Sequence, residues 1–286
     1  GCGGRGRAPG RRPPRGRAPM RRPPLAGLAR ALGDRLPVEA ASVTGRGSVR
    51  LTLQRPLMHD VQFEDWRFNI DGEINNFAGQ MTSRRVALSN GTMRIRGDQR
   101  AVTVSGPVRA GASDIREVRW TEYLNRRGRA SSEYQIAGVF DANDLQRLGY
   151  SVAAYARGRI DVTVSGEGRG FDVDQALVQL DLTAEAVQTP RGFWSKPAGE
   201  AARASFRVER QRDGGLAFLN VSAQGADMDA QGRMRLTQDG RVAEAEANRF
   251  IIEGRTNARL LARRGEDGGL DVTVRGAMFD AAPFMG

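Results

Sequence analysis

The chain has 286 residues, 40% of them hydrophobic, which is enough to bury a core in one large or two ordinary domains. Its formal net charge of +11 raises a nucleic acid or an anionic membrane as a partner, so the location of the charge is decisive. The single cysteine, Cys2, excludes an intrachain disulfide framework and a cysteine-rich zinc site.

The positive charge is concentrated at the start of the chain. Residues 1 to 35 contain ten arginines and one acid, Asp34, whereas the remainder carries 34 basic and 32 acidic side chains. The opening is almost wholly Gly, Pro, Arg and Ala, and it cannot bury enough apolar area to offset the entropy of ordering. We therefore expect residues 1–36 to be a disordered basic segment, either a linker or a polybasic arm. Because the remainder is nearly neutral, no nucleic-acid partner is expected.

Apolar and polar residues alternate through much of residues 37–286, which predicts half-buried β-strands. The alternating positions are, in chain order, Val49/Leu51/Leu53, Val102/Val104, Ile160/Val162/Val164, Ala204/Phe206/Val208, Met234/Leu236 and Leu270/Val272/Val274. Phase slips within residues 61–70 and 171–182 predict bulges or strand breaks. One short helix is expected after residues 141–144, where aspartate and asparagine side chains can cap it.

Turn signals separate the last strands. The dipeptides Asp-Gly at 213–214, 239–240 and 267–268 recur every 26 to 28 residues, a spacing of two strands and two turns. This predicts a meander of successive hairpins that grows in one direction. A curled open sheet and a closed sandwich give the same alternation, and the alternation alone favours the closed sandwich.

The sequence gives little support for a catalytic or metal-binding site. His59 is the only histidine, so any His-based triad or two-histidine metal site must rest on it. The pairs Asp172/Asp174 and Asp227/Asp229 can share one strand face, but no calcium-loop spacing accompanies them. The glycine-rich stretch 166–170 lacks the spacing of a phosphate loop and joins two β-like runs, which predicts a hairpin turn. We expect no enzyme, no metal and no cofactor.

Several phrases resemble one family. They are VSGP at 104–107, VRWTE at 118–122, SEYQIAG at 132–138, LDLT at 180–183 and GFWSKPAG at 192–199. Their order and spacing resemble the AsmA-like superfamily, and within it the central region of YhdP-type (TamB-related) envelope proteins. The pairing of the LDLT strand with the loop that carries Trp194 and Lys196 is the most specific element. For these two side chains, packing against the sheet rim is favoured over contact with a lipid headgroup.

The resemblance implies a mostly β protein, a long antiparallel meander forming a curled, repetitive sheet with an apolar inner groove and few short helices. It implies a periplasmic protein of a Gram-negative bacterium, held in the inner membrane by an anchor that this chain does not contain, so that residues 37–286 are a fragment. Phospholipid acyl chains would lie in the groove and move between the inner and outer membranes. The expected groove wall consists of Ile160, Val162, Val164, Val178, Leu180, Leu182, Phe206 and Val208. The alternative is a closed β-sandwich scaffold or protein-interaction module without lipid cargo.

Overall fold

The computed structural model describes residues 38–54, 67–81, 86–124, 130–147, 156–170, 172–189, 194–265 and 267–282. All of them belong to one compact unit, Arg35–Gly286. The basic segment expected at residues 1–36, and His59, lie outside the described residues. The phase slip expected within 61–70 falls largely outside them as well.

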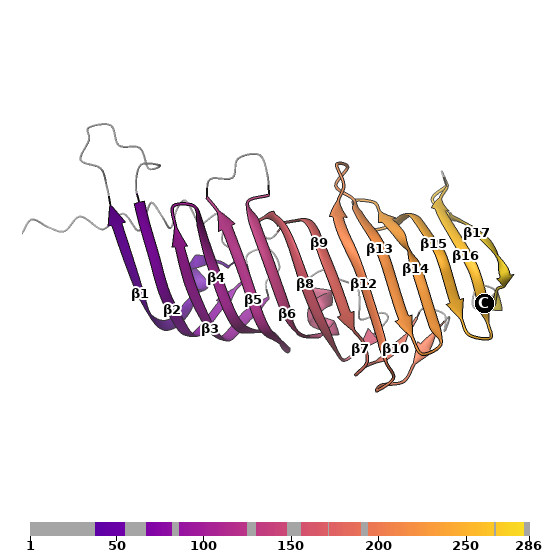
Figure 1. Ribbon diagram of the computed structural model, residues 1–286, viewed down its shortest axis with the longest axis horizontal. Coiled ribbons are helices and arrows are strands. Elements are labelled where there is room, and N and C mark those ends of the chain that lie inside the picture. The colour runs from indigo at the N-terminus through magenta and orange to yellow at the C-terminus, as the bar shows by residue number, and fades with distance from the viewer. Residues whose placement is uncertain are drawn as a thin grey trace, which may run out of the picture. The chain divides into compact units, whose positions relative to one another are not determined.

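Fourteen strands form one sheet (Figure 1). They are β1 (Thr44–Gln54), β2 (Arg67–Gln80), β3 (Ala87–Asp98), β4 (Ala101–Ala110), β5 (Ser113–Tyr123), β6 (Ser132–Asp141), β8 (Arg159–Arg169), β9 (Asp172–Asp181), β12 (Ala202–Arg210), β13 (Leu216–Gly225), β14 (Met228–Leu236), β15 (Val242–Ile252), β16 (Thr256–Arg264) and β17 (Leu270–Met278). Their spatial order follows the chain order, and every neighbouring pair is antiparallel. The expected meander is confirmed.

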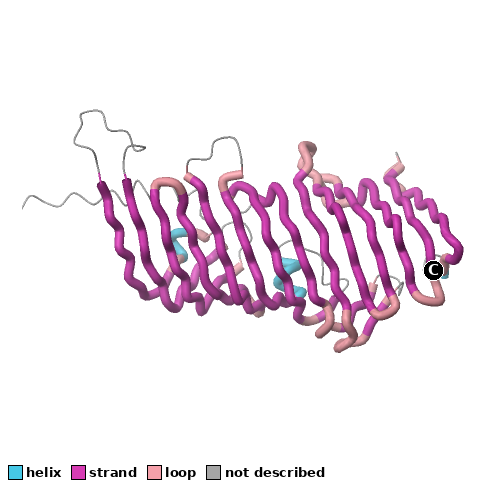
Figure 2. Tube along the Cα trace, in the orientation of Figure 1, coloured by secondary structure: helices cyan, strands magenta, loops and turns pink. Residues whose placement is uncertain are grey.

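Two short excursions leave the meander. The first holds the helix α2 (Ala142–Arg147) and β7 (Ala156–Arg157), and the second holds β10 (Ala186–Gln188) and β11 (Ser195–Lys196). Strands β7, β10 and β11 pair into a second, three-stranded sheet. A 3₁₀ turn, η1 (Ala40–Ser42), precedes β1, and little other helix is seen among the described residues (Figure 2).

The local predictions hold where the residues are described. Gly214, Gly240 and Gly268 have φ angles of 82°, 79° and 82°, the left-handed conformation that tight hairpins need. The expected slip near residue 173 is a bulge, because the register of β8 and β9 shifts between Glu167 and Gly168. The expected helix is α2, and Asp141 accepts a hydrogen bond from the backbone nitrogen of Asn143 at 2.9 Å.

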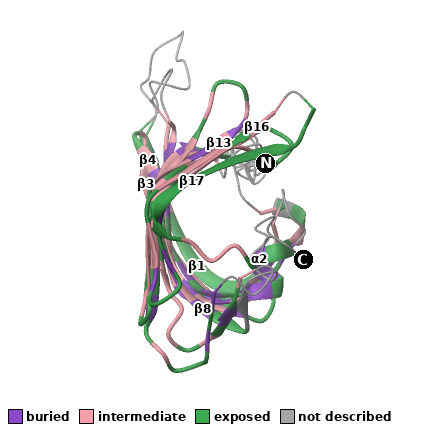
Figure 3. Ribbon diagram, turned by 90° about the vertical axis from the view of Figure 1, so that its right-hand side faces the viewer, coloured by how far each residue is buried: buried purple, intermediate pink, exposed green. Residues whose placement is uncertain are grey.

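The sheet stays open, with β1 and β17 at its two edges. Figure 3 looks along the succession of strands and shows them bending, so that one side of the sheet is concave and α2 lies on that side. A closed sandwich, the alternative from sequence, is not what the described residues form, because the only other sheet has three short strands. The fold is a single curved layer with local covering.

Candidate functional site

The concave face is lined by apolar residues that are aligned from strand to strand. Across β8, β9 and β12 the register places Val162 opposite Leu180, and Val164 opposite Val178, which in turn lies opposite Phe206. Because side chains alternate between the two faces of a strand, these aligned positions share one face. The expected wall residues therefore come together on one surface.

Burial along this wall is graded. Ile160 is completely buried and Val162 is 5% exposed. The other expected wall residues are half-buried: Val164, Val178, Leu180, Leu182, Phe206 and Val208. Ile160 lies opposite Phe140 of β6, and Val208 lies opposite Ala176 of β9.

The apolar alignment continues to the C-terminal edge. From Val208 it passes through Phe218, Met234, Ala245, Ala262 and Val272, one residue per strand from β12 to β17. The rings of Phe206 and Phe218 lie 5.5 Å apart at an angle of 53°. These positions are half-buried except Val272, which is 52% exposed. None of them belongs to a buried hydrophobic cluster of the described residues; the cluster under the excursions reaches these strands only near their ends, at Ala202, Met228 and Ile252.

The apolar side chains of the N-terminal and central strands are more deeply buried than those of the C-terminal strands. Phe77, Met93 and Val108 form one buried cluster, and Trp120, Tyr134 and Ala176 form another. A third cluster brings Leu145 of α2, Val187 of β10 and Trp194 onto Ile160 and Val162. The excursions therefore cover the concave face near the ends of the central strands.

Trp194 and Lys196 hold this cover in place, and both are buried, at 5% and 4% exposure. The indole Nε1 of Trp194 donates to Asp227 at 2.7 Å, which ties the excursion to the turn between β13 and β14. The ammonium of Lys196 donates to backbone carbonyl oxygens within its own excursion. The bond of Trp194 therefore crosses to the large sheet, whereas the bonds of Lys196 stay within the excursion.

One buried acid on the concave face escaped the sequence analysis. Glu122 is fully buried and accepts a hydrogen bond from the hydroxyl of Ser132, which itself accepts one from the backbone nitrogen of Gly170 at 2.7 Å. Glu122 lies opposite Val102, at a position where the alternation calls for an apolar residue. The signal was present: Val118, Trp120 and Glu122 are in phase, and only the last is polar.

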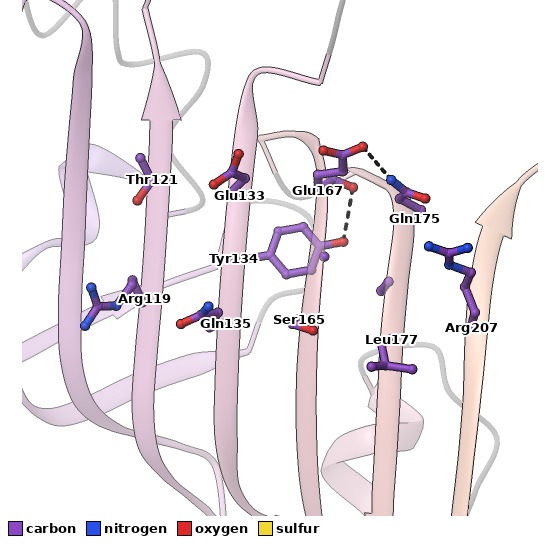
Figure 4. Close-up of a pocket in the computed structure, with 12 residues that line it drawn as sticks. Arg119, Thr121, Glu133, Tyr134, Gln135, Ser165, Glu167, Gln175, Leu177 and Arg207 are labelled. Carbon is purple, nitrogen blue, oxygen red and sulfur yellow. Dashed lines mark hydrogen bonds between the residues drawn. The ribbon is translucent and has the colours of Figure 1, made fainter.

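The convex face is polar. Figure 4 shows a pocket on it, with Arg119, Gln135, Ser165 and Arg207 among its lining. Glu167 accepts a hydrogen bond from Gln175 at 2.6 Å there, and Thr103 and Thr121 share another at 3.0 Å. Leu177 also lines this pocket, and its apolar side chain is 46% exposed.

Three of the four acids in the pairs singled out in the sequence, Asp172, Asp227 and Asp229, interact with other residues of the chain. Asp229 accepts from Arg249 at 2.6 Å, and Asp172 lies 4.0 Å from Arg210. Among the described residues no group of three or more His, Cys, Asp or Glu side chains is placed to hold a metal ion. The glycine-rich stretch at 166–170 ends β8 and turns into β9, with Gly170 at φ 60°, as the hairpin prediction required.

Two acids at the surface have a lowered pKa, and in both the cause is a hydrogen bond within the chain. A hydrogen bond from Arg159, helped by the nearby charge of Arg109, lowers the pKa of Asp114. Hydrogen bonds from Thr183 lower the pKa of Asp181.

No family model, no curated protein and no solved structure matches this chain. In the described part of the chain, no helix has both the length and the apolar character needed to cross a bilayer.

Proposed function

We propose that the chain is a lipid-binding conduit segment of a cell-envelope protein and takes part in phospholipid transport between the inner and outer membranes, without catalysis. One observation carries the proposal: the aligned, half-buried apolar positions that run from β12 to β17 with no described layer over them. A continuous row of partly exposed apolar side chains is typical of a binding face.

Acyl chains fit this face chemically. They are flexible, need no hydrogen bonds, and gain about 0.8 kcal/mol for each buried methylene, so a smooth apolar wall suffices to bind them. The bend of the strands adds to this, because a concave sheet surrounds a chain on more than one side (Figure 3). Movement along the wall would require neither an acid, a base nor a metal.

The family resemblance supplies the setting of the proposal. The segments 180–183 and 192–199 carry it; the first covers the end of β9, and the described part of the second, 194–199, contains β11. On this reading the chain is part of a longer periplasmic protein, anchored in the inner membrane by a segment outside the given sequence. Its partners are phospholipid acyl chains.

The test is mass spectrometry of organic extracts from the chain, exported to a bacterial periplasm and purified without detergent. We expect stoichiometric phospholipid in the unchanged chain. Val208→Asp places a charge on the half-buried concave face and should abolish retention. Leu177→Asp makes the same kind of change on the convex face and should leave retention intact.

Circular dichroism confirms that both variants fold before the extracts are compared. Equal lipid in both, or no lipid in the unchanged chain, would refute the conduit. The second outcome would favour the alternative of a protein-interaction module without lipid cargo.

A further inference from the structure

A row of uncharged polar side chains crosses the middle of the convex face. The register places its members opposite one another, one per strand over β8, β9, β12, β13 and β14. They are Thr163, Gln179, Ser205, Ser222 and Gln231. We call these five residues the neutral row.

The pocket of Figure 4 adjoins the neutral row. Gln135, Ser165 and Leu177 line this pocket and lie opposite one another on β6, β8 and β9. Ser165 and Leu177 are two residues away from Thr163 and Gln179 on the same strands, so they share their face. The pocket has a volume of about 360 Å³, which is within the range of small-ligand sites. Pocket and neutral row therefore form one continuous polar surface.

The amides and hydroxyls of this surface are available to a ligand. Among the described residues, the side chains of Gln135, Ser165 and the neutral row form no hydrogen bond within the chain, whereas Gln175 in the same pocket donates to Glu167 at 2.6 Å. These groups can exchange water for a ligand atom without breaking a bond inside the protein.

The charges beside this surface are balanced within the chain. Arg119 lies 3.8 Å from Glu117, and Arg207 lies 3.7 Å from Glu209. The pocket lining holds two arginines and two glutamates, so its formal charge is zero. A nucleic acid binds through uncompensated cations, and a peptide that extends a sheet binds at an edge. An uncharged partner rich in hydroxyl and amide groups fits this face better than either.

We propose that the pocket and the neutral row bind an uncharged, β-1,4-linked glycan that lies across the strands. Sugar hydroxyl and acetamido groups both donate and accept hydrogen bonds, as do the serine, threonine and glutamine side chains that they would meet. In an extended β-1,4-linked chain each sugar advances by nearly the spacing of neighbouring strands, about 4.8 Å. Successive sugars therefore meet successive members of the neutral row. The exposed side chain of Leu177 offers an apolar contact to the C–H face of a ring.

Heteronuclear NMR of the full chain, titrated with cellotetraose and with chitotetraose to about 10 mM, tests the site. The surface is exposed and its hydrogen bonds replace bonds to water, so we expect a dissociation constant of about 0.1 to 1 mM. The side-chain amide signals of Gln135, Gln179 and Gln231 should shift. Gln238 is an exposed glutamine in the hairpin between β14 and β15, and its signal should stay in place. Raising the salt concentration from about 0.05 to about 0.5 M should change the affinity less than twofold, because no net charge is involved.

Gln179→Ala removes an amide from the neutral row and should weaken binding about threefold to tenfold. Gln238→Ala is the matched control and should change nothing, and circular dichroism confirms that both variants fold. The absence of shifts with both sugars, or equal affinity in Gln179→Ala and the unchanged chain, would overturn the proposal. Signals that move with protein concentration alone would also overturn it, because they would show a second copy of the chain on this face.

The glycan site and the conduit can fail separately. They lie on opposite faces of the sheet, so Val208→Asp, which should abolish lipid retention, should leave glycan binding unchanged. A loss of glycan binding in a folded Val208→Asp chain would contradict the placement of the site on the convex face.

Discussion

Replacing Lys196 by methionine tests what holds the covering excursion on the sheet. The ammonium donates to the carbonyl oxygens of Glu185 and of Pro197, the latter at 2.9 Å, and lies 3.5 Å from that of Thr183. A hydrogen bond to a charged group contributes about 1.5 to 3 kcal/mol. Methionine keeps the buried stem and removes the cost of burying the charge, which offsets part of that loss. We expect a net loss of about 2 to 4 kcal/mol in the local free energy of opening.

Hydrogen exchange reads this change directly. Two backbone hydrogen bonds close the excursion. The amide of Thr189 donates to the carbonyl oxygen of Trp194, and the amide of Gly199 donates to the carbonyl oxygen of Thr183, both at 2.8 Å. A loss of 2 kcal/mol accelerates exchange of these amides by about thirtyfold. Arg203→Met is the control, because that side chain is 80% exposed and 3.7 Å from Asp181, a surface pair of little energy. Acceleration of less than about threefold in Lys196→Met would refute the role of the ammonium.

Two further changes probe the fold itself. Gly111→Ala should cost at least about 2 kcal/mol in the free energy of unfolding, because φ is 62° and the new Cβ would lie 2.5 Å from a carboxylate oxygen of Asp144. Gly254→Ala is the matched comparison: φ is 66°, but the new Cβ would have no atom within 4 Å, so it should cost only about 1 kcal/mol. Urea titration of both variants measures the two free energies of unfolding. The pKa of Asp114 is lowered by Arg159, so its stabilisation is complete above the unfolded pKa of about 4 and is lost as pH falls further. Asp114→Asn should therefore flatten the fall in melting temperature below about pH 4, and an unchanged acid limb would contradict the pairing.

The strands and turns could be predicted because their causes are local. Alternation alone predicts the strands around Val49 and Ile160, and the Asp-Gly dipeptides predict the hairpin turns. The bulge opposite Glu167 was visible as a slip in phase. These features depend on a few neighbouring residues, and neighbouring strands in the chain are neighbours in the sheet.

The rest depended on residues far apart in the chain. The link from Trp194 to Asp227 forms only once the excursion folds over the sheet. The burial of Glu122 depends on β6, which brings Ser132 to it. The choice between an open sheet and a sandwich was also beyond the alternation, because a strand has the same period whether lipid, water or a second sheet faces it.

In a β-sandwich the second sheet covers the apolar face of the first, whereas the apolar face of a single curved sheet has no such cover. In the central strands the chain provides one, with Leu145, Val187 and Trp194 buried against the sheet. From Phe206 to Val272 it provides none among the described residues. On the proposed function, a flexible apolar molecule such as an acyl chain lies on that part of the face, because such a molecule needs no hydrogen bonds from the sheet.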